Sequence, residues 1–199
     1  NLFGVDIMEE AVEICKLRLF LRLVSQVDRV EHLEPLPDID FNVRAGNALV
    51  GFASLDGARE AILGGDQARM DVADAMSPIL EAATRADVAF ERFHSLQLRN
   101  GEAAVSEQRS AKDDLRCVLA ELRDELDRYL ADEYGINASD EERLASWRLS
   151  HQPFHWFTEF YGLMRRGGFD VVVGNPPYLQ VGKLNGRYRP LNFRTFGCR

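Results

Sequence analysis

The sequence predicts an α/β fold, namely part of a doubly wound, Rossmann-like parallel sheet that carries a large α-helical insertion. Residues 1–52 read as strand, helix and strand, and a further apolar run at 169–173 is bounded by glycines. Apolar runs of this length are typical of strands that are covered on both faces of a parallel sheet. Between these regions, residues 54–150 have the apolar periodicity of helices.

The N-terminal unit is predicted from three short patterns. A strand at 1–7 carries Asp6 near its end, and residues 8–27 follow as a helix whose many apolar side chains indicate that it is largely buried. A second strand is expected at 41–45, and it ends at Gly46-Asn47. Strand, helix and strand in this order form one α/β unit.

The insertion is predicted from helical patterns. Residues 71–98 are helical, with Ser77-Pro78 as a cap and restart. Residues 112–130 give the clearest helix in the chain. Its apolar stripe consists of Leu115, Val118, Leu119, Leu122, Leu126, Tyr129 and Leu130.

Ser139 and Glu142 form a candidate capping box for a further helix. From these patterns we expect three regions: a core part at 1–53, the helical insertion at 54–150, and a second core part at 151–199.

Charge is distributed unevenly along the chain, whose net charge is −8. Residues 101–146 hold thirteen acids and six bases, so this region is not expected to face the phosphates of a nucleic acid. Residues 179–199 hold no acid, and Lys183, Arg187, Arg189 and Arg194 are candidate contacts to nucleic-acid phosphates, with a solvated loop as the alternative.

The composition of the chain indicates the cellular compartment in which the protein is expected. The longest apolar runs fall short of the roughly 20 residues of a membrane span, so no membrane association is expected. The three cysteines are an odd number without a paired spacing, which is typical of reduced thiols in a cytoplasmic protein.

The segment Asn175-Pro176-Pro177-Tyr178 follows the apolar run directly. An amine on an aromatic ring is a poor nucleophile, and two rigid acceptors can draw its nitrogen into position for attack. The Asn175 amide and the Pro176 carbonyl supply such acceptors, and Tyr178 supplies a face on which an unstacked base can lie. The alternative is an ordinary turn with a packed tyrosine.

Two further strand ends carry candidate binding residues. Asp6 can accept both hydroxyls of a ribose, or it can cap the helix that follows. Asn47 can bond the edge of an adenine, or it can serve as a turn residue. His151, His155 and Glu159 invite a metal interpretation, but no cysteine cluster lies near them, and we predict no metal site.

These residues carry a family resemblance. The segment GFDVVVGNPPYLQ resembles motif IV of the amino-methyltransferases that use S-adenosylmethionine. The segments NLFGVDIMEEAVEICKLRLFLRL and NVRAGNALVG resemble motifs II and III of large N6-adenine DNA methyltransferases of restriction–modification and phage-exclusion systems, including the type IIG enzymes. The resemblance covers about 1–52 and 151–199, and residues between them correspond to a helical insertion.

The resemblance implies a Rossmann-like methyltransferase fold and methyl transfer to adenine N6 in double-stranded DNA with the target base flipped out. It implies Asp6, Ile7, Asn47 and Ala48 as cofactor-binding residues, with Asp6 on the ribose and Asn47 near the adenine. Asn175, Pro176, Pro177 and Tyr178 are the implied catalytic residues. Many relatives have an acid followed by an aromatic residue where this chain has Asn47-Ala48.

The resemblance also implies what is missing. The family's glycine-rich cofactor loop is not in the sequence, so we expect the chain to be an internal, inactive fragment of a longer protein. Its cofactor loop would lie upstream and its recognition domain downstream. Protein-glutamine or RNA-guanine N2 methyltransferases, and a non-catalytic helical interaction module, remain alternatives. The recognition sequence, an accompanying nuclease, the oligomeric state and the partner of the insertion are not predicted.

Overall fold

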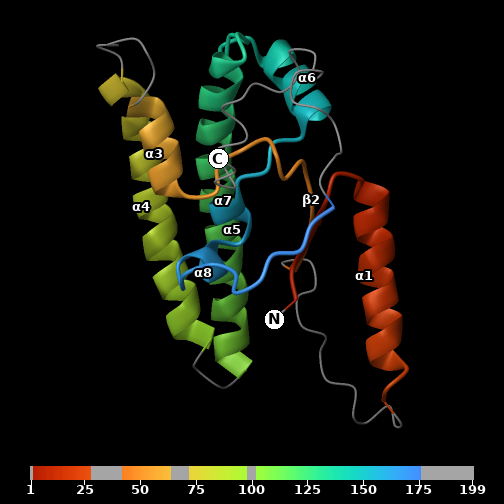
Figure 1. The fold of residues 1–199 in the computed structure, drawn as a ribbon. Coiled ribbons are helices and arrows are strands. Elements are labelled where there is room, and N and C mark those ends of the chain that lie inside the picture. Colours follow the sequence, from red (N-terminus) through yellow and green to blue (C-terminus); the bar gives the residue numbers. More distant parts are fainter. Residues whose placement is uncertain (1, 28–41, 64–71, 98–101, 176–199) are drawn as a thin grey trace.

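The computed structural model describes residues 2–27, 42–63, 72–97 and 102–175 (Figure 1). It is a helix-rich α/β structure with a small parallel sheet. In chain order the elements are β1 (Gly4–Asp6), α1 (Glu9–Val24), β2 (Val43–Ala45), α3 (Leu55–Leu63), α4 (Val72–Gln97), α5 (Glu102–Glu133), α6 (Glu141–His151), α7 (Trp156–Glu159) and α8 (Tyr161–Met164).

The two strands pair in parallel, which confirms the predicted strand–helix–strand unit. Gly4 lies opposite Val43 and Asp6 lies opposite Ala45. One further hydrogen bond, from the Gly46 N–H to the Asp6 carbonyl at 2.8 Å, continues the pairing beyond β2. Both strands are shorter than predicted, but their carboxyl ends lie together as the pattern requires.

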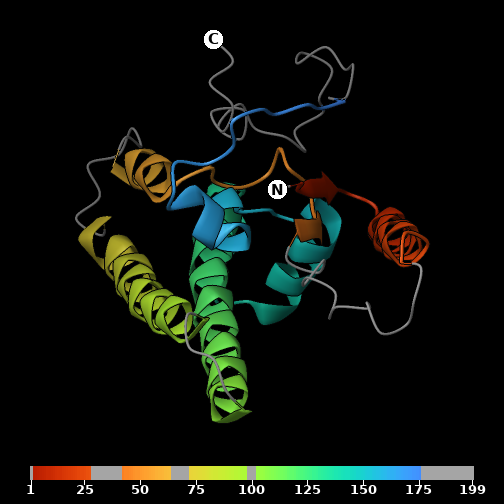
Figure 2. The same cartoon turned by 90° about the horizontal axis from the view of Figure 1, so that it is seen from below.

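The prediction that the first helix is largely buried is wrong for the described structure. Val12 is the buried residue of α1, whereas Ile14, Leu17 and Leu21 are each more than half exposed. The apolar side chains of this helix are distributed around it, and one flank rests on β1 and β2. The described residues provide no element that covers the other flank (Figure 2).

Helices α4 and α5 pack side by side along most of their length and form the largest core (Figures 1 and 2). Ile79, Ala82 and Ala86 of α4 meet Leu122 and Leu126 of α5, and all five are almost fully buried. Four members of the predicted stripe on α5 are buried: Leu115, Leu122, Leu126 and Leu130.

Two predicted helix boundaries are wrong. Helix α4 continues through Pro78, so Ser77-Pro78 is neither a cap nor a restart. The Ser77 hydroxyl donates to the Glu81 carboxylate at 3.0 Å, and packing against α5 outweighs the hydrogen bond that proline removes. The cap of α6 is Asp140 rather than Ser139, because the Asp140 carboxylate accepts the Arg143 N–H at 3.1 Å.

The predicted buried strand at 169–173 is also wrong for the described structure. Residues 171–175 have no regular secondary structure, and Val171, Val172 and Val173 are 76%, 62% and 91% exposed. An apolar segment becomes a buried strand when it has a hydrogen-bonding neighbour, and here it lies apart from β1 and β2 (Figure 2).

None of the helices in the described part of the chain combines the length and the apolar character that a membrane span requires.

Candidate functional site

The carboxyl end of the sheet brings two of the predicted site residues together. Asp6 ends β1, and Asn47 follows β2 by two positions. The parallel register places Asp6 opposite Ala45, so both candidate residues lie at the same edge. In open α/β sheets this edge is where ligands bind.

Asp6 is not the N-cap of α1, which is Met8, but its carboxylate bonds the backbone just before the helix. Its Oδ1 accepts the Met8 N–H at 2.8 Å, which fixes the turn into α1. Asp6 is nevertheless exposed. Ile7 beside it is about half exposed. A carboxylate held by one backbone bond and open to solvent can still accept the hydroxyls of a ligand.

Asn47 is placed differently. It is only 6% exposed, and its Oδ1 accepts the Leu49 N–H at 3.1 Å. An asparagine that bonds the backbone two positions on forms an Asx-turn. The carbonyl of the neighbouring Ala48 accepts the Trp156 indole N–H at 3.3 Å. The Asn47 amide oxygen and the Ala48 carbonyl therefore stabilise the loop that follows β2.

The loop after β2 runs beside the segment that follows α6, and together residues 46–52 and 152–156 form what we call the neck. Hydrogen bonds join Asn47 N–H to the Gln152 carbonyl at 2.7 Å, Phe154 N–H to the Val50 carbonyl at 2.6 Å, and Trp156 N–H to the Phe52 carbonyl at 2.9 Å. The neck therefore closes the insertion at its base.

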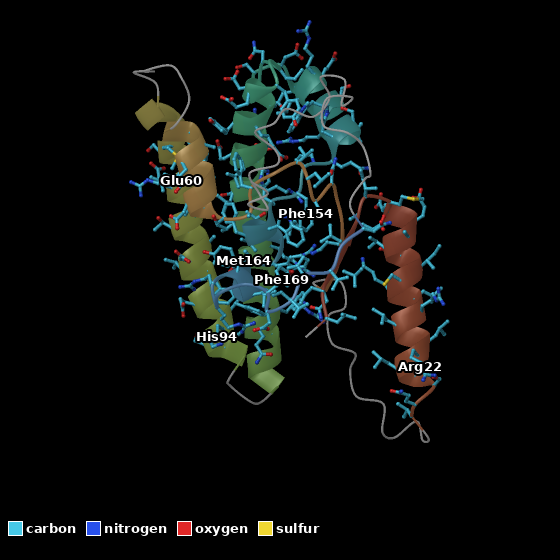
Figure 3. The ribbon with its side chains drawn as sticks, viewed as in Figure 1. Arg22, Glu60, His94, Phe154, Met164 and Phe169 are labelled. Carbon is cyan, nitrogen blue, oxygen red and sulfur yellow. The ribbon has the colours of Figure 1, made fainter. Side chains whose placement is uncertain are left out.

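Glycines allow this close approach. A Cβ placed on Gly51 would stand 2.1 Å from the Phe154 carbonyl oxygen, and one on Gly46 would stand 2.6 Å from the Phe154 ring. Gly51 also has a φ of +143°, which other residues rarely adopt. In the view of Figure 3 Phe154 lies in the central part of the molecule, and its ring packs against Trp156 at 5.2 Å and Phe160 at 5.8 Å between centroids.

A polar network of side chains ties the neck to the insertion. His155 is fully buried; its Nδ1 accepts the Phe52 N–H at 3.2 Å, so its Nε2 carries the proton and donates to Asp127 at 3.0 Å. The other Asp127 oxygen accepts the Arg148 Nε–H at 2.8 Å. Arg148 also pairs with Asp124, which in turn pairs with Arg128 at 2.8 Å.

Sequence reasoning did not find this network, because its members lie far apart in the chain; the Phe52–His155 bond alone spans 103 positions. Both ring nitrogens of His155 are bonded within the protein, one to the Phe52 N–H and one to Asp127. No group of three ligating side chains that could hold a metal was found in the part of the chain that the structure describes.

Beside the strand ends lies a cavity of about 350 Å³ between the sheet and the insertion. Gly46 and Glu9 line it on the sheet side, and Arg123, Asp124 and Arg148 line it on the helical side. Asp6 ends the adjoining strand but is not among the lining residues. The cavity therefore lies at the carboxyl end of the sheet, is lined by both polar and apolar groups, and is walled on one side by the network.

The catalytic candidates are only partly described. Asn175 is the last described residue, and it is exposed. Pro176, Pro177, Tyr178, Lys183, Arg187, Arg189 and Arg194 lie outside the described residues. The roles assigned to all of these residues stay predictions.

A parallel sheet with polar residues at its carboxyl ends, followed by the Asn175 segment, defines a candidate α/β enzyme of the methyltransferase class. The chain belongs to the Eco57I restriction-modification methylase family, whose model matches residues 1–196. This confirms the resemblance to restriction–modification methyltransferases that the sequence indicates.

A relative in Methanocaldococcus jannaschii, named as a candidate type II restriction enzyme and methyltransferase, is similar to this chain. The two sequences are 31% identical over an alignment of 212 positions, and this alignment covers 89% of this chain. The chain spans 18% of the length of that relative. No solved structure matches the chain.

Proposed function

We propose that the full-length protein transfers a methyl group from S-adenosylmethionine to N6 of an adenine in double-stranded DNA, as part of a restriction–modification or phage-defence system in the cytoplasm. The observation that carries this proposal is the Asn175-Pro176-Pro177-Tyr178 segment in a member of a restriction-modification methylase family. Membership of the family makes DNA the expected substrate.

The chemistry of the segment supports adenine N6 as the target. The adenine amine shares its lone pair with the ring, so an acceptor on each of its hydrogens raises its reactivity. The Asn175 amide oxygen and the Pro176 carbonyl fill these roles, and Pro177 stiffens the turn between them and Tyr178. Tyr178 stacks on the base after it leaves the duplex.

The sheet edge supports cofactor binding. The exposed Asp6 carboxylate would hold the cofactor ribose, and the half-exposed Ile7 would contact its adenine ring. S-adenosylmethionine supplies the electrophilic methyl group. For Asn47 and Ala48 the structure supports an indirect role, in which the Asx-turn and the indole bond hold the wall of the site.

We also propose that the missing partners of this chain are other parts of a longer protein. The exposed valines at 171–173 and the exposed flank of α1 are surfaces that further strands and helices of a Rossmann-like sheet would cover. The 18% coverage of the similar protein is consistent with this proposal. The basic residues Lys183, Arg187, Arg189 and Arg194 would contact the DNA phosphates.

The test is methyl transfer by the full-length protein from labelled cofactor to DNA. We expect label in N6-methyladenine, and we expect Asn175→Ala to reduce the rate by about 10²–10³-fold, as removal of a transition-state hydrogen bond does elsewhere. Asp6→Ala should instead weaken cofactor binding. As a matched control, Asn137→Ala alters an asparagine that bonds the Ser139 N–H in the insertion.

Each other outcome has a definite meaning. Label in protein or RNA but not in DNA would assign the chain to the glutamine or guanine N2 enzymes. Equal rates for Asn175→Ala and the wild type would remove the catalytic role of Asn175. No transfer to any substrate would favour a non-catalytic interaction module.

A further inference from the structure

Helix α8, which precedes the Asn175 segment, is fixed to α4 of the insertion by polar contacts. The Tyr161 hydroxyl donates to the Asp87 carboxylate at 2.5 Å. Arg165, one residue beyond α8, pairs with Glu91 at 2.7 Å and with Asp87 at 3.4 Å. Burial raises the pKa of Tyr161, and the Asp87 carboxylate raises it further, so the hydroxyl keeps its proton.

Phe90 makes the steric part of the same contact. Its ring lies against Tyr161 at 5.5 Å between centroids and beneath the Arg165 guanidinium at 5.3 Å. It also fills the space beside Gly162, where an added Cβ would stand 2.8 Å from the Phe90 ring. The absence of a side chain at Gly162 therefore determines how closely α8 approaches α4.

After α8, contacts within the protein fix the chain as far as Phe169. The Gly168 N–H bonds the Leu163 carbonyl at 3.1 Å and closes the helix. Phe169 then packs edge-to-face against Phe160 at 5.6 Å and against Trp156 at 5.7 Å. Phe160 joins α7 to α8, so Phe169 packs at the start of α8, six residues before Asn175, and residues 170–175 that follow it are exposed.

We propose that Gly162, with Phe90 opposite it, is a positioning residue for the transfer reaction: the helical insertion, through α4, sets the position of α8 and thereby of Asn175. The inference rests on the proposed function, because it needs Asn175 to touch the substrate. Displacements of about 1 Å at a reacting group can reduce rates by about 100-fold. The insertion is then a support for the catalytic segment.

The test compares Gly162→Ala with the double variant Gly162→Ala/Phe90→Leu in the full-length protein. The added methyl of the single variant would stand 2.8 Å from the Phe90 ring, which packs against Tyr161 and Arg165, so we expect α8 to shift away from α4. Leu at position 90 is smaller than Phe and leaves room for the methyl. We expect Gly162→Ala to lower kcat at least tenfold and to change KM for DNA and cofactor less than twofold. The double variant should regain most of kcat.

The matched control is Gly57→Ala, a helical glycine in α3 whose added Cβ meets only the Ser54 hydroxyl oxygen at 3.2 Å, the atom that accepts the Gly57 N–H. It should leave kcat unchanged. Unchanged kcat in Gly162→Ala, or no recovery in the double variant while both remain folded, would overturn the inference.

Two further measurements keep the inference testable on its own. If Gly162→Ala does not fold, Tyr161→Phe replaces it, because it removes the hydroxyl that donates to Asp87 and keeps the ring beside Phe90: it should lower kcat with little change in KM, and an unchanged kcat overturns the inference. If the wild type methylates no adenine, the proposed function fails, and hydrogen exchange over 160–175 decides. Faster exchange in Gly162→Ala that the double variant reverses supports positioning, and equal exchange refutes it.

Discussion

At Gly51 two segments of the main chain come into contact, and this contact is possible because Gly51 has no side chain. The Phe154 carbonyl occupies the place where a Cβ would stand, at 2.1 Å. Because this oxygen belongs to the main chain, it cannot swing away as a flexible side chain could. A methyl group at this position would therefore displace the main chain of the neck.

We expect Gly51→Ala to destabilise the 199-residue chain by about 3 kcal/mol or more, through backbone strain and displacement of the neck. Gly135→Ala is the matched control, since its φ is +78° but nothing lies within 4 Å of the added Cβ. Strain alone should cost about 1–2 kcal/mol there. Urea denaturation measures both, and equal losses would show that the close approach at Gly51 is unimportant.

Asp127 is the central residue of the polar network, because its carboxylate accepts hydrogen bonds from both His155 and Arg148. We expect Asp127→Asn to destabilise the chain by about 3–5 kcal/mol, since the amide puts a donor opposite one of these donors and removes the charge that Arg148 faces. Urea denaturation measures the loss.

The control is Asp114→Asn in the exposed pair with Arg92, where both side chains are about half exposed. Exposed ion pairs contribute about 0–1 kcal/mol. A loss at Asp127 no larger than the loss at Asp114 would contradict a structural role for the network.

Individual residues show how far the sequence can be read at this scale. The local bonds of Asp6 to Met8 and of Asn47 to Leu49 both span two positions, as in Asx-turns. The sequence analysis offered a turn for Asn47, which the structure confirms, and a helix cap for Asp6, which it does not. The partnership of His155 with Asp127 and Phe52 could not be predicted in the same way. It depends on the neck, which joins distant segments that no local pattern relates.

At the scale of elements, α5 joins the insertion to the neck and to α6. Asp124 and Asp127 project from it towards Arg148 of α6, and Arg123 lies 3.5 Å from Glu159 of α7. Its apolar stripe was predictable from periodicity, because packing against α4 uses the spacing that the sequence displays. The charged side chains of the same helix carry no such signal, so their partners were not predicted.

The contact between α5 and α6 should depend on pH. Burial raises the pKa of Asp124, but hydrogen bonds and charges from Arg128 and Arg148 outweigh it, so the net pKa lies below its usual value. A carboxylate with a lowered folded-state pKa stabilises the protein above the unfolded value of about 3.9, and it loses this effect as the pH falls through the folded-state pKa.

We therefore expect Asp124→Asn to be less stable than the wild type at neutral pH, with the difference shrinking as the pH falls below about 4. Denaturation at a series of pH values measures it. Asp113→Asn, at a 64% exposed carboxylate that pairs with Arg116 one turn away, should show little difference at any pH. A difference at Asp124 that persists unchanged in acid would contradict the assignment.

Helix α1 and residues 171–173 show why some elements were predicted wrongly. Their apolar sequences favour burial, and the pattern by itself does not say which element supplies the cover. In the described structure α1 rests on β1 and β2 through one flank, and Val173 is 91% exposed. The helix itself forms as predicted, because its secondary structure depends on local preferences and its burial does not.

For the whole molecule, the neck means that the insertion begins and ends at one place. The core that holds Val50 also contains Leu130, Leu144 and Trp147, so the base of the insertion and the loop after β2 share one apolar cluster. Exposed apolar side chains gather on α1, at Ile14, Leu17 and Leu21, and at residues 171–173. Figures 1 and 2 show α1 at the side of the molecule. Large exposed apolar patches on soluble proteins mark sites of association.

We expect the exposed flank of α1 to make the 199-residue chain bind hydrophobic dyes and self-associate. The double substitution Ile14→Lys/Leu17→Lys should lower dye fluorescence and association, while the free energy of unfolding changes by no more than about 1 kcal/mol, because both side chains are more than half exposed. Val88→Lys, at a 68% exposed position on α4, is the control for charge alone. If it lowers dye binding equally, net charge rather than the α1 flank governs association; if the double substitution unfolds the chain, α1 is buried in solution by a contact that its exposed flank does not predict.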